Sequence, residues 1–193
     1  MQKLTRADLY TLETYARERQ AFRARVLAHK QARSVHLGPH LTLLFEDRLT
    51  VQYQVQEMLR IERTFEAAGI QDELDAYNPL IPDGANLKAT LLIEYADADE
   101  RAQRLVELRG IEHRLALAVG ELAPAVAIAD EDLERSTEQK TSAVHFLRFE
   151  LTSAHAAAFK AGTPARLIVD HPMYHADAEL APPTLAALAA DLD

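Results

Sequence analysis

The sequence contains no cysteine. This absence excludes a disulfide framework, a thiolate nucleophile, a cysteine-ligated iron–sulfur cluster and a cysteine-type zinc site. No stretch approaches the run of about 18 apolar residues that would predict a membrane-spanning helix. If the protein takes part in redox chemistry, a group other than its own thiols must carry the electrons.

Several catalytic signatures are also missing. The chain has no HExxH, Walker, GxGxxG or GxSxG motif, which removes the sequence support for a zincin, a P-loop enzyme, a dinucleotide-binding domain or a nucleophile elbow. A Glu-x-x-His pair is absent as well, so the chain lacks the inward-facing ligands of a di-iron carboxylate bundle. The protein is therefore not itself a rubrerythrin.

The composition is that of a soluble globular protein. The 193 residues are 48% hydrophobic and 26% charged, enough for one sizeable core or two small subdomains that share one. The opening residues, MQKLTRADLY, lack the apolar region of a secretory signal, so we expect a cytoplasmic location and no contact with a membrane.

The net charge of −9 is unevenly distributed. Residues 1–33 hold eight Lys and Arg against three Asp and Glu, whereas the remainder holds 13 against 27. An acidic body of this kind would repel a polyanion, so we do not expect binding to nucleic acid. The sequence does not predict an oligomeric state.

The first 77 residues predict a helical part with a small hairpin. One or two helices should cover residues 6–31, and two β-prone runs, 34–37 and 41–45, flank Gly38-Pro39. Asp47 is placed to cap one long amphipathic helix over residues 48–69, and a shorter helix should follow at 71–77.

The proline-rich segment 78–86 is the predicted seam, and a sheet-containing part should follow over 87–172. We expect a tail with a terminal helix over 173–193. The predicted order β-α-β-β-β-α-β gives an α+β fold with a helix-backed mixed sheet, a ferredoxin-like variant. Its strands are 87–95, 113–119, 125–129, 142–151 and 165–169, and its helices are 99–108 and 152–161.

Glu62 is the most informative residue of the predicted long helix. At 100° per residue it shares a face with Val51, Val55, Met58 and Phe65. Because an unpaired buried carboxylate is costly, Glu62 should have a partner. That partner is either an arginine in a structural ion pair or a metal ion.

Polar residues near the hairpin and on this helix form two candidate sets. His36 and His40 bracket the Gly-Pro turn and could join carboxylates in a site for iron, manganese or zinc. Alternatively, the two histidines are simply a pair on the protein surface, and the polar residues of the helix form a face exposed to solvent. The candidate metal ligands are His36, His40, Glu46, Glu57 and Glu62, and the candidates for binding a ligand or a partner are Arg33, Arg48, Tyr53, Gln56 and Arg60. The sequence predicts no catalytic residue.

Four strings, RSVHLGPHLTLLFEDR, YQVQEMLRIER, NPLIPDG and SAVHFLRFEL, resemble an uncharacterised bacterial family known only as a domain of unknown function. Genes of that family often neighbour those of rubrerythrin-like proteins and heterodisulfide-reductase-type iron–sulfur oxidoreductases. The resemblance implies a role in peroxide or redox handling, and it brings no established catalytic residues.

Two function classes follow. The first is an accessory or interaction protein that works with an iron–sulfur oxidoreductase or a rubrerythrin-like, di-iron partner. The second is a metal-binding protein or metalloenzyme with a His/Glu site in a cleft between the helical and sheet parts, because such seams often form clefts. The sequence leaves open whether the protein is an enzyme.

Overall fold

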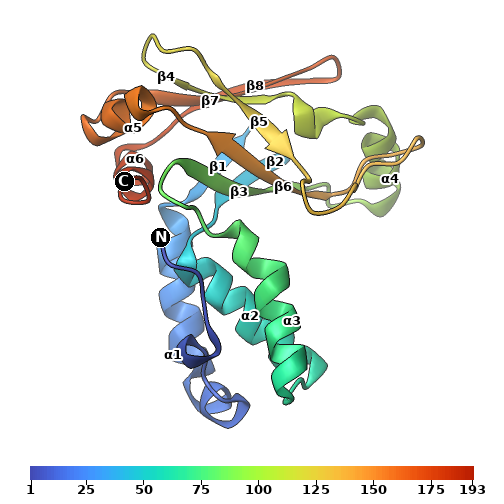
Figure 1. The fold of residues 1–193 in the computed structure, drawn as a ribbon. Coiled ribbons are helices and arrows are strands. Elements are labelled where there is room, and N and C mark those ends of the chain that lie inside the picture. The colour runs from blue at the N-terminus through green and yellow to red at the C-terminus, as the bar shows by residue number, and fades with distance from the viewer.

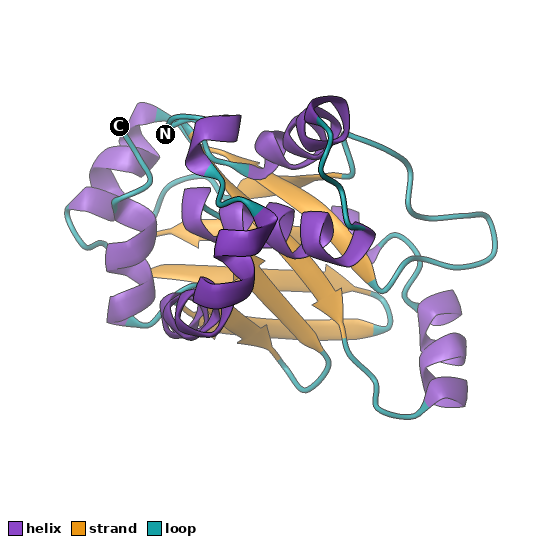
Figure 2. Cartoon of the chain, turned by 90° about the horizontal axis from the view of Figure 1, so that it is seen from below, coloured by secondary structure: helices purple, strands orange, loops and turns teal.

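A computed structural model describes residues 1–193 and shows a helical arm attached to a strongly curved sheet (Figure 1). The arm consists of α1 (Leu12–Gln31), α2 (Arg48–Glu62) and α3 (Ala67–Tyr77), with the short 3-10 helices η1 (Arg6–Asp8) and η2 (Asn78–Leu80) beside them. Seen from below, these helices lie across the strands (Figure 2). No helix combines the length and the apolar composition needed to cross a membrane.

The sheet has eight strands in the order β1-β2-β3-β6-β5-β4-β7-β8, and every neighbouring pair is antiparallel. The predicted ferredoxin-like, helix-backed mixed sheet is therefore wrong. The strands are β1 (Ser34–Leu37), β2 (Leu41–Phe45), β3 (Asn86–Ile93), β4 (Leu115–Val119), β5 (Ala125–Ala129), β6 (Val144–Glu150), β7 (Ala165–His171) and β8 (Tyr174–Glu179).

The sheet curls into a nearly closed barrel, in which β1 and β8 approach each other without pairing. The Tyr174 hydroxyl bridges this gap: it donates to the Leu37 carbonyl oxygen at 2.6 Å and accepts from the His40 amide at 3.2 Å. Gly38 has a φ of +68°, and a Cβ there would lie 2.6 Å from the same hydroxyl. Glycine at this turn therefore allows the edges to meet.

Alternation along the strands places the core inside the barrel. In β3, for example, Leu87, Ala89, Leu91 and Ile93 are buried and belong to the main core cluster. The remaining helices lie at the two ends of the barrel instead of covering a face: α4 (Ala98–Glu107) is at one end, and α5 (Ser153–Lys160) and α6 (Pro182–Ala189) are at the other (Figure 1).

Two further predictions about the elements need correction. The expected helix 48–69 ends at Glu62, because Arg63 adopts a left-handed conformation with a φ of +56°, and α3 begins only at Ala67. The predicted tail 173–193 contains the expected terminal helix, α6, but it also contains β8, which completes the sheet.

Candidate metal centre

A buried polar cluster lies at the α4 end of the barrel. His145 is the second residue of β6, where strand alternation turns it inward in line with Leu147 and Phe149. Glu112 belongs to η3 (Ile111–His113), directly before β4, and Asp130 directly follows β5. Because Ala129, the last residue of β5, pairs with Leu147 of β6, the following residue, Asp130, lies near the start of β6 and beside His145.

Hydrogen bonds fix the His145 ring, which is fully buried. Its Nδ1 lies 2.6 Å from Oδ2 of Asp130, and its Nε2 lies 3.0 Å from the Ser142 carbonyl oxygen and 2.8 Å from Oγ1 of Thr141. A carboxylate and a carbonyl oxygen can only accept. Both ring nitrogens are therefore placed to donate a hydrogen bond. Alternatively, one nitrogen carries no hydrogen and binds a metal ion.

Glu112 is held on the Nε2 side of the ring, with its Oε2 3.9 Å from Nε2 of His145. Ser136 donates to Oε1 at 2.5 Å and Thr141 donates to Oε2 at 3.2 Å. Burial from water would raise the pKa of Glu112, but the Ser136 hydrogen bond and the field of His145 outweigh it and leave that pKa below its usual value. The site therefore favours an ionised Glu112.

Asp130 is anchored on its other side. Its Oδ1 accepts from the Phe146 amide at 3.0 Å and lies 3.3 Å from NH1 of Arg135. The residue has a φ of +51°, a left-handed conformation that aspartate tolerates better than most side chains. This backbone turns the carboxylate back toward the ring.

The arrangement has the ligand chemistry of a metal centre. One donor atom from each of Glu112, Asp130 and His145 lies within 4.8 Å of the others. Carboxylates and imidazole together suit iron, manganese and zinc. Because Oδ2 of Asp130 is hydrogen-bonded to Nδ1, a metal on the Nε2 side would have His145 and Glu112 as ligands, and Asp130 would be the outer carboxylate that orients the imidazole.

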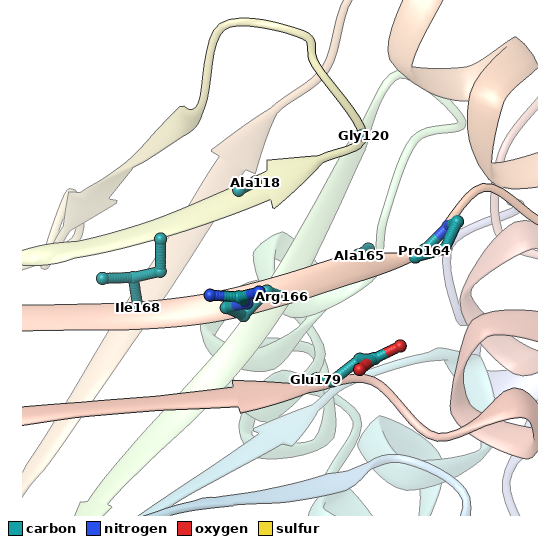
Figure 3. Close-up of a pocket in the computed structure, with 7 residues that line it drawn as sticks. All are labelled: Ala118, Gly120, Pro164, Ala165, Arg166, Ile168 and Glu179. Carbon is teal, nitrogen blue, oxygen red and sulfur yellow. The ribbon is translucent and has the colours of Figure 1, made fainter.

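A hollow on the outer face of β4, β7 and β8 differs from this buried cluster (Figure 3). Arg166 and Glu179 lie opposite each other in the strand register, and Arg166 also lies 3.4 Å from exposed Asp177. Ala118, Pro164 and Ile168 form the rest of its wall. Since its charged groups are exposed, this hollow offers no preorganised site.

Comparison with known proteins identifies the family. The family model described as "Protein of unknown function (DUF3501)" matches residues 3–192. The chain belongs to this family. A crystal structure of a novel protein of unknown function from Burkholderia pseudomallei K96243 is 56% identical, with complete coverage of both chains and a TM-score of 0.95. No curated protein matches the chain.

None of the metal ligands predicted from the sequence of this DUF3501 protein belongs to the barrel-end cluster. His36 contacts Thr42 at 3.0 Å, and His40 stacks on Tyr95 with ring centroids 4.0 Å apart. Glu62 is exposed, so the premise that it lies on a buried face is wrong. The helix α2 ends at Glu62, and the chain turns at the left-handed Arg63 that follows.

The Glu57 carboxylate is hydrogen-bonded to Arg19 and Tyr15. Arg19 donates twice to its carboxylate, at 2.8 Å each, and the Tyr15 hydroxyl donates at 2.7 Å. The Arg19 hydrogen bonds outweigh burial and lower the pKa of Glu57 to about 2. Glu46, the remaining predicted ligand, is buried and lines a separate cleft.

The predicted ligand-binding residues of this family member are mostly engaged within the protein. Arg33 forms a buried ion pair with Asp191 at 2.7 Å, and Arg48 lies 2.5 Å from Asp8. Gln56 is fully buried and accepts from the Tyr10 amide. The other two are Tyr53, which contacts the Phe22 ring, and Arg60, which lies 3.3 Å from Glu57.

None of the five cluster residues, Glu112, Asp130, Ser136, Thr141 and His145, was among the candidates predicted from the sequence. One signal was present: a strand histidine in register with Leu147 and Phe149 points to the core. An acidic residue directly after the neighbouring strand was a second signal, but its use required knowledge of which strands pair.

Proposed function

We propose that this protein binds a divalent metal ion, iron, manganese or zinc, at the barrel-end cluster. Nε2 of neutral His145 and the ionised Glu112 carboxylate are the principal ligands, and the Thr141 and Ser142 oxygens complete the set. Asp130 holds the ring through Nδ1.

The observation that carries this proposal is the surroundings of His145 Nε2. Its neighbours are all oxygen atoms: the Ser142 carbonyl, the Thr141 hydroxyl and, at 3.9 Å, the Glu112 carboxylate. The Thr141 hydroxyl can donate or accept, but the Ser142 carbonyl and the Glu112 carboxylate only accept, so beside them this buried nitrogen is placed to bear a hydrogen or to bind a metal. The alternative to a metal ion on Nε2 is a proton. His145 would then be a positively charged imidazolium between the carboxylates of Glu112 and Asp130.

Metal analysis separates the two occupants. Untagged protein purified without chelators is analysed by inductively coupled plasma mass spectrometry, as isolated and after incubation with Fe²⁺, Mn²⁺ or Zn²⁺ and desalting. We expect one equivalent in the wild type and its loss in Glu112→Gln and His145→Gln. His36→Gln is the matched control, since His36 is an exposed histidine outside the cluster.

Two results would refute the proposal. Trace metal in the reconstituted wild type would leave the proton as the occupant. Metal retained in Glu112→Gln and His145→Gln, but lost in His36→Gln, would return the site to the set predicted from the sequence. Circular dichroism of each variant checks that loss of metal is not loss of fold.

We further infer that the protein serves as an accessory to an iron–sulfur oxidoreductase or a rubrerythrin-like partner. The resemblance to a family with such gene neighbours motivates this inference. One surface feature favours partner binding: Ile61 and Phe65, at the far end of the arm, are 62% and 69% exposed. Apolar side chains exposed to this extent are candidates for contact with a partner protein.

A pull-down with each recombinant partner tests the accessory role. We expect wild-type protein to retain the partner and Phe65→Glu to lose it. Leu133→Glu is the matched control, because Leu133 is 56% exposed in the loop that follows β5. Failure of the wild type to bind either partner would end this inference without affecting the metal proposal.

A further inference from the structure

The arm and the outer wall of the barrel enclose a cavity of about 290 Å³, here called the arm–barrel cleft. Its volume is close to the lower end of the range typical for small-molecule sites, about 300 Å³. The strands β2, β3 and β6 form one wall, and α2, α3 and η2 form the other. Apolar side chains dominate its lining, with Leu44, Leu92, Val144 and Phe146 on the sheet and Val51 and Leu80 on the arm.

The apolar wall departs from the usual pattern of an antiparallel sheet. Strand alternation points Leu44, Leu92 and Phe146 outward, away from the barrel core, where polar side chains are common. These three side chains are only partly buried, and Val144 beside them is 37% exposed. The arm therefore covers this patch incompletely, and apolar surface remains free for a ligand.

Glu46 supplies the charge of the cleft. The residue is 8% exposed, and its carboxylate accepts from Thr50 Oγ1 at 2.5 Å and from Thr90 Oγ1 at 2.6 Å. Both donors are neutral hydroxyls. The charge of Glu46 helps to raise the pKa of Arg33, but the guanidinium makes its close ion pairs with Asp47 at 3.1 Å and Asp191 at 2.7 Å, not with Glu46.

A buried carboxylate with only neutral donors is electrostatically incomplete, because buried charges in proteins are normally paired. Each carboxylate oxygen can accept more than one hydrogen bond. Lys30 also lines the cleft, but its ammonium lies 5.8 Å from the centre of the Tyr53 ring, a cation–π distance. Glu46 therefore retains capacity for a cation from outside the chain.

We propose that the arm–barrel cleft binds a small organic cation, a primary amine with an apolar body. The ammonium group pairs with Glu46 between the Thr50 and Thr90 hydroxyls, and the apolar body lies against Leu44, Leu92 and Phe146. Charge-assisted hydrogen bonds to Glu46 provide orientation, and burial of the apolar body provides most of the affinity. This site is separate from the barrel-end cluster, so it does not depend on the metal proposal.

Three probes of similar size test the ligand class: phenethylamine, 2-phenylethanol and 3-phenylpropionate. Binding is followed by calorimetry and by NMR of ¹³C-labelled leucine and valine methyl groups. We expect the amine to bind at least about tenfold more tightly than the alcohol, as for a hydrogen bond to a charged group. Methyl shifts should concentrate at Leu44, Val51, Leu80 and Leu92.

Variants locate the interaction. Glu46→Gln preserves the shape of the side chain and should abolish the preference for the amine, whereas Glu62→Gln, an exposed glutamate on α2, should leave it unchanged. Leu92→Trp fills the cleft and should reduce amine binding even if Glu46→Gln proves unstable. Binding in His145→Gln should equal that of the wild type.

Three outcomes would overturn the proposal. Equal binding of amine and alcohol would show that Glu46 does not select a cation. Tighter binding of 3-phenylpropionate would assign the cleft to anions held by Lys30. Absence of methyl shifts with all three probes would show that the cleft takes no ligand of this class.

Discussion

The ion pair between Arg33 and Asp191 joins the α1–β1 junction to the C-terminal segment, and its loss should be among the most destabilising single changes. Arg33 follows α1, and Asp191 follows α6. Two bonds of 2.7 and 2.8 Å run from the guanidinium to the two carboxylate oxygens. Both side chains are nearly inaccessible, at 4% and 3% exposure.

Asp191→Ala would remove one of the carboxylates that pair with the buried guanidinium of Arg33. Burial would lower the pKa of Arg33, but its bonds to Asp191 and the field of Asp47 outweigh this effect and raise it, so Arg33 stays charged. Breaking a buried pair typically costs about 3–5 kcal/mol. Because Asp47 still lies 3.1 Å from Nε, we expect the lower end, about 3 kcal/mol.

Urea denaturation followed by circular dichroism measures this free energy of unfolding. In a separate thermal unfolding experiment, the midpoint temperature should fall by roughly 6–12 °C. Asp177→Ala is the matched control, since its pairing with Arg166 is exposed at both ends and should contribute at most about 1 kcal/mol. Replacing both partners, Arg33→Met with Asp191→Leu, should cost less than Asp191→Ala alone. A cost for Asp191→Ala no greater than that for Asp177→Ala would refute the reasoning.

Two further predictions concern acid stability and barrel closure. The pKa of Glu57 is lowered from 4.5 to about 2 by Arg19, so ionised Glu57 stabilises the fold above its unfolded pKa, and this contribution disappears as the pH falls from 4.5 toward 2. Acid titration should therefore show a steeper loss of stability in that window for the wild type than for Glu57→Gln, and identical profiles would contradict the assignment. Tyr174→Phe removes the hydroxyl that joins Leu37 to the β7–β8 hairpin. We expect the free energy of unfolding to fall by about 1–2 kcal/mol and hydrogen exchange at the His40 amide to become faster. Unchanged exchange at that amide would show that the hydroxyl does not close the barrel.

Local sequence signals located most strands but not their partners. The expected runs 34–37, 41–45 and 125–129 coincide with β1, β2 and β5, because glycine, proline and apolar alternation bound them clearly. The strand β8 was missed because its inward residues, Tyr174, Ala176 and Ala178, include two small side chains with weak apolar contrast to their neighbours. Strand pairing depends on residues far apart in the sequence. The prediction of β-α-β units assumed that α4 and α5 connect parallel strands across a face of the sheet, whereas these helices lie at the ends of an antiparallel barrel.

The same limit explains why the barrel-end cluster was missed. Glu112, Asp130 and His145 are separated by 18 and 15 positions in the sequence and come together only because β5 lies between β4 and β6. No spacing rule within one helix or one turn can describe such a set. Motif searches favour ligands that are close in the sequence, such as His36 and His40, whereas the residues of the barrel-end cluster come from the ends of several strands.

The physical rule applied to Glu62 was sound, but the residue was the wrong one. A carboxylate removed from water needs a partner, and the sequence placed Glu62 in the apolar stripe on the assumption that the helix continues to Gly69. The left-handed Arg63 ends the helix, and Glu62 is exposed to solvent. Glu46, which directly follows β2, meets the condition instead: it is buried, and only Thr50 and Thr90 donate to its carboxylate. Burial decides which acidic residue needs a cation, and burial depends on where a helix ends and which strands pair. The amine-binding experiment on Glu46→Gln therefore tests the same argument at the residue where the fold makes it applicable.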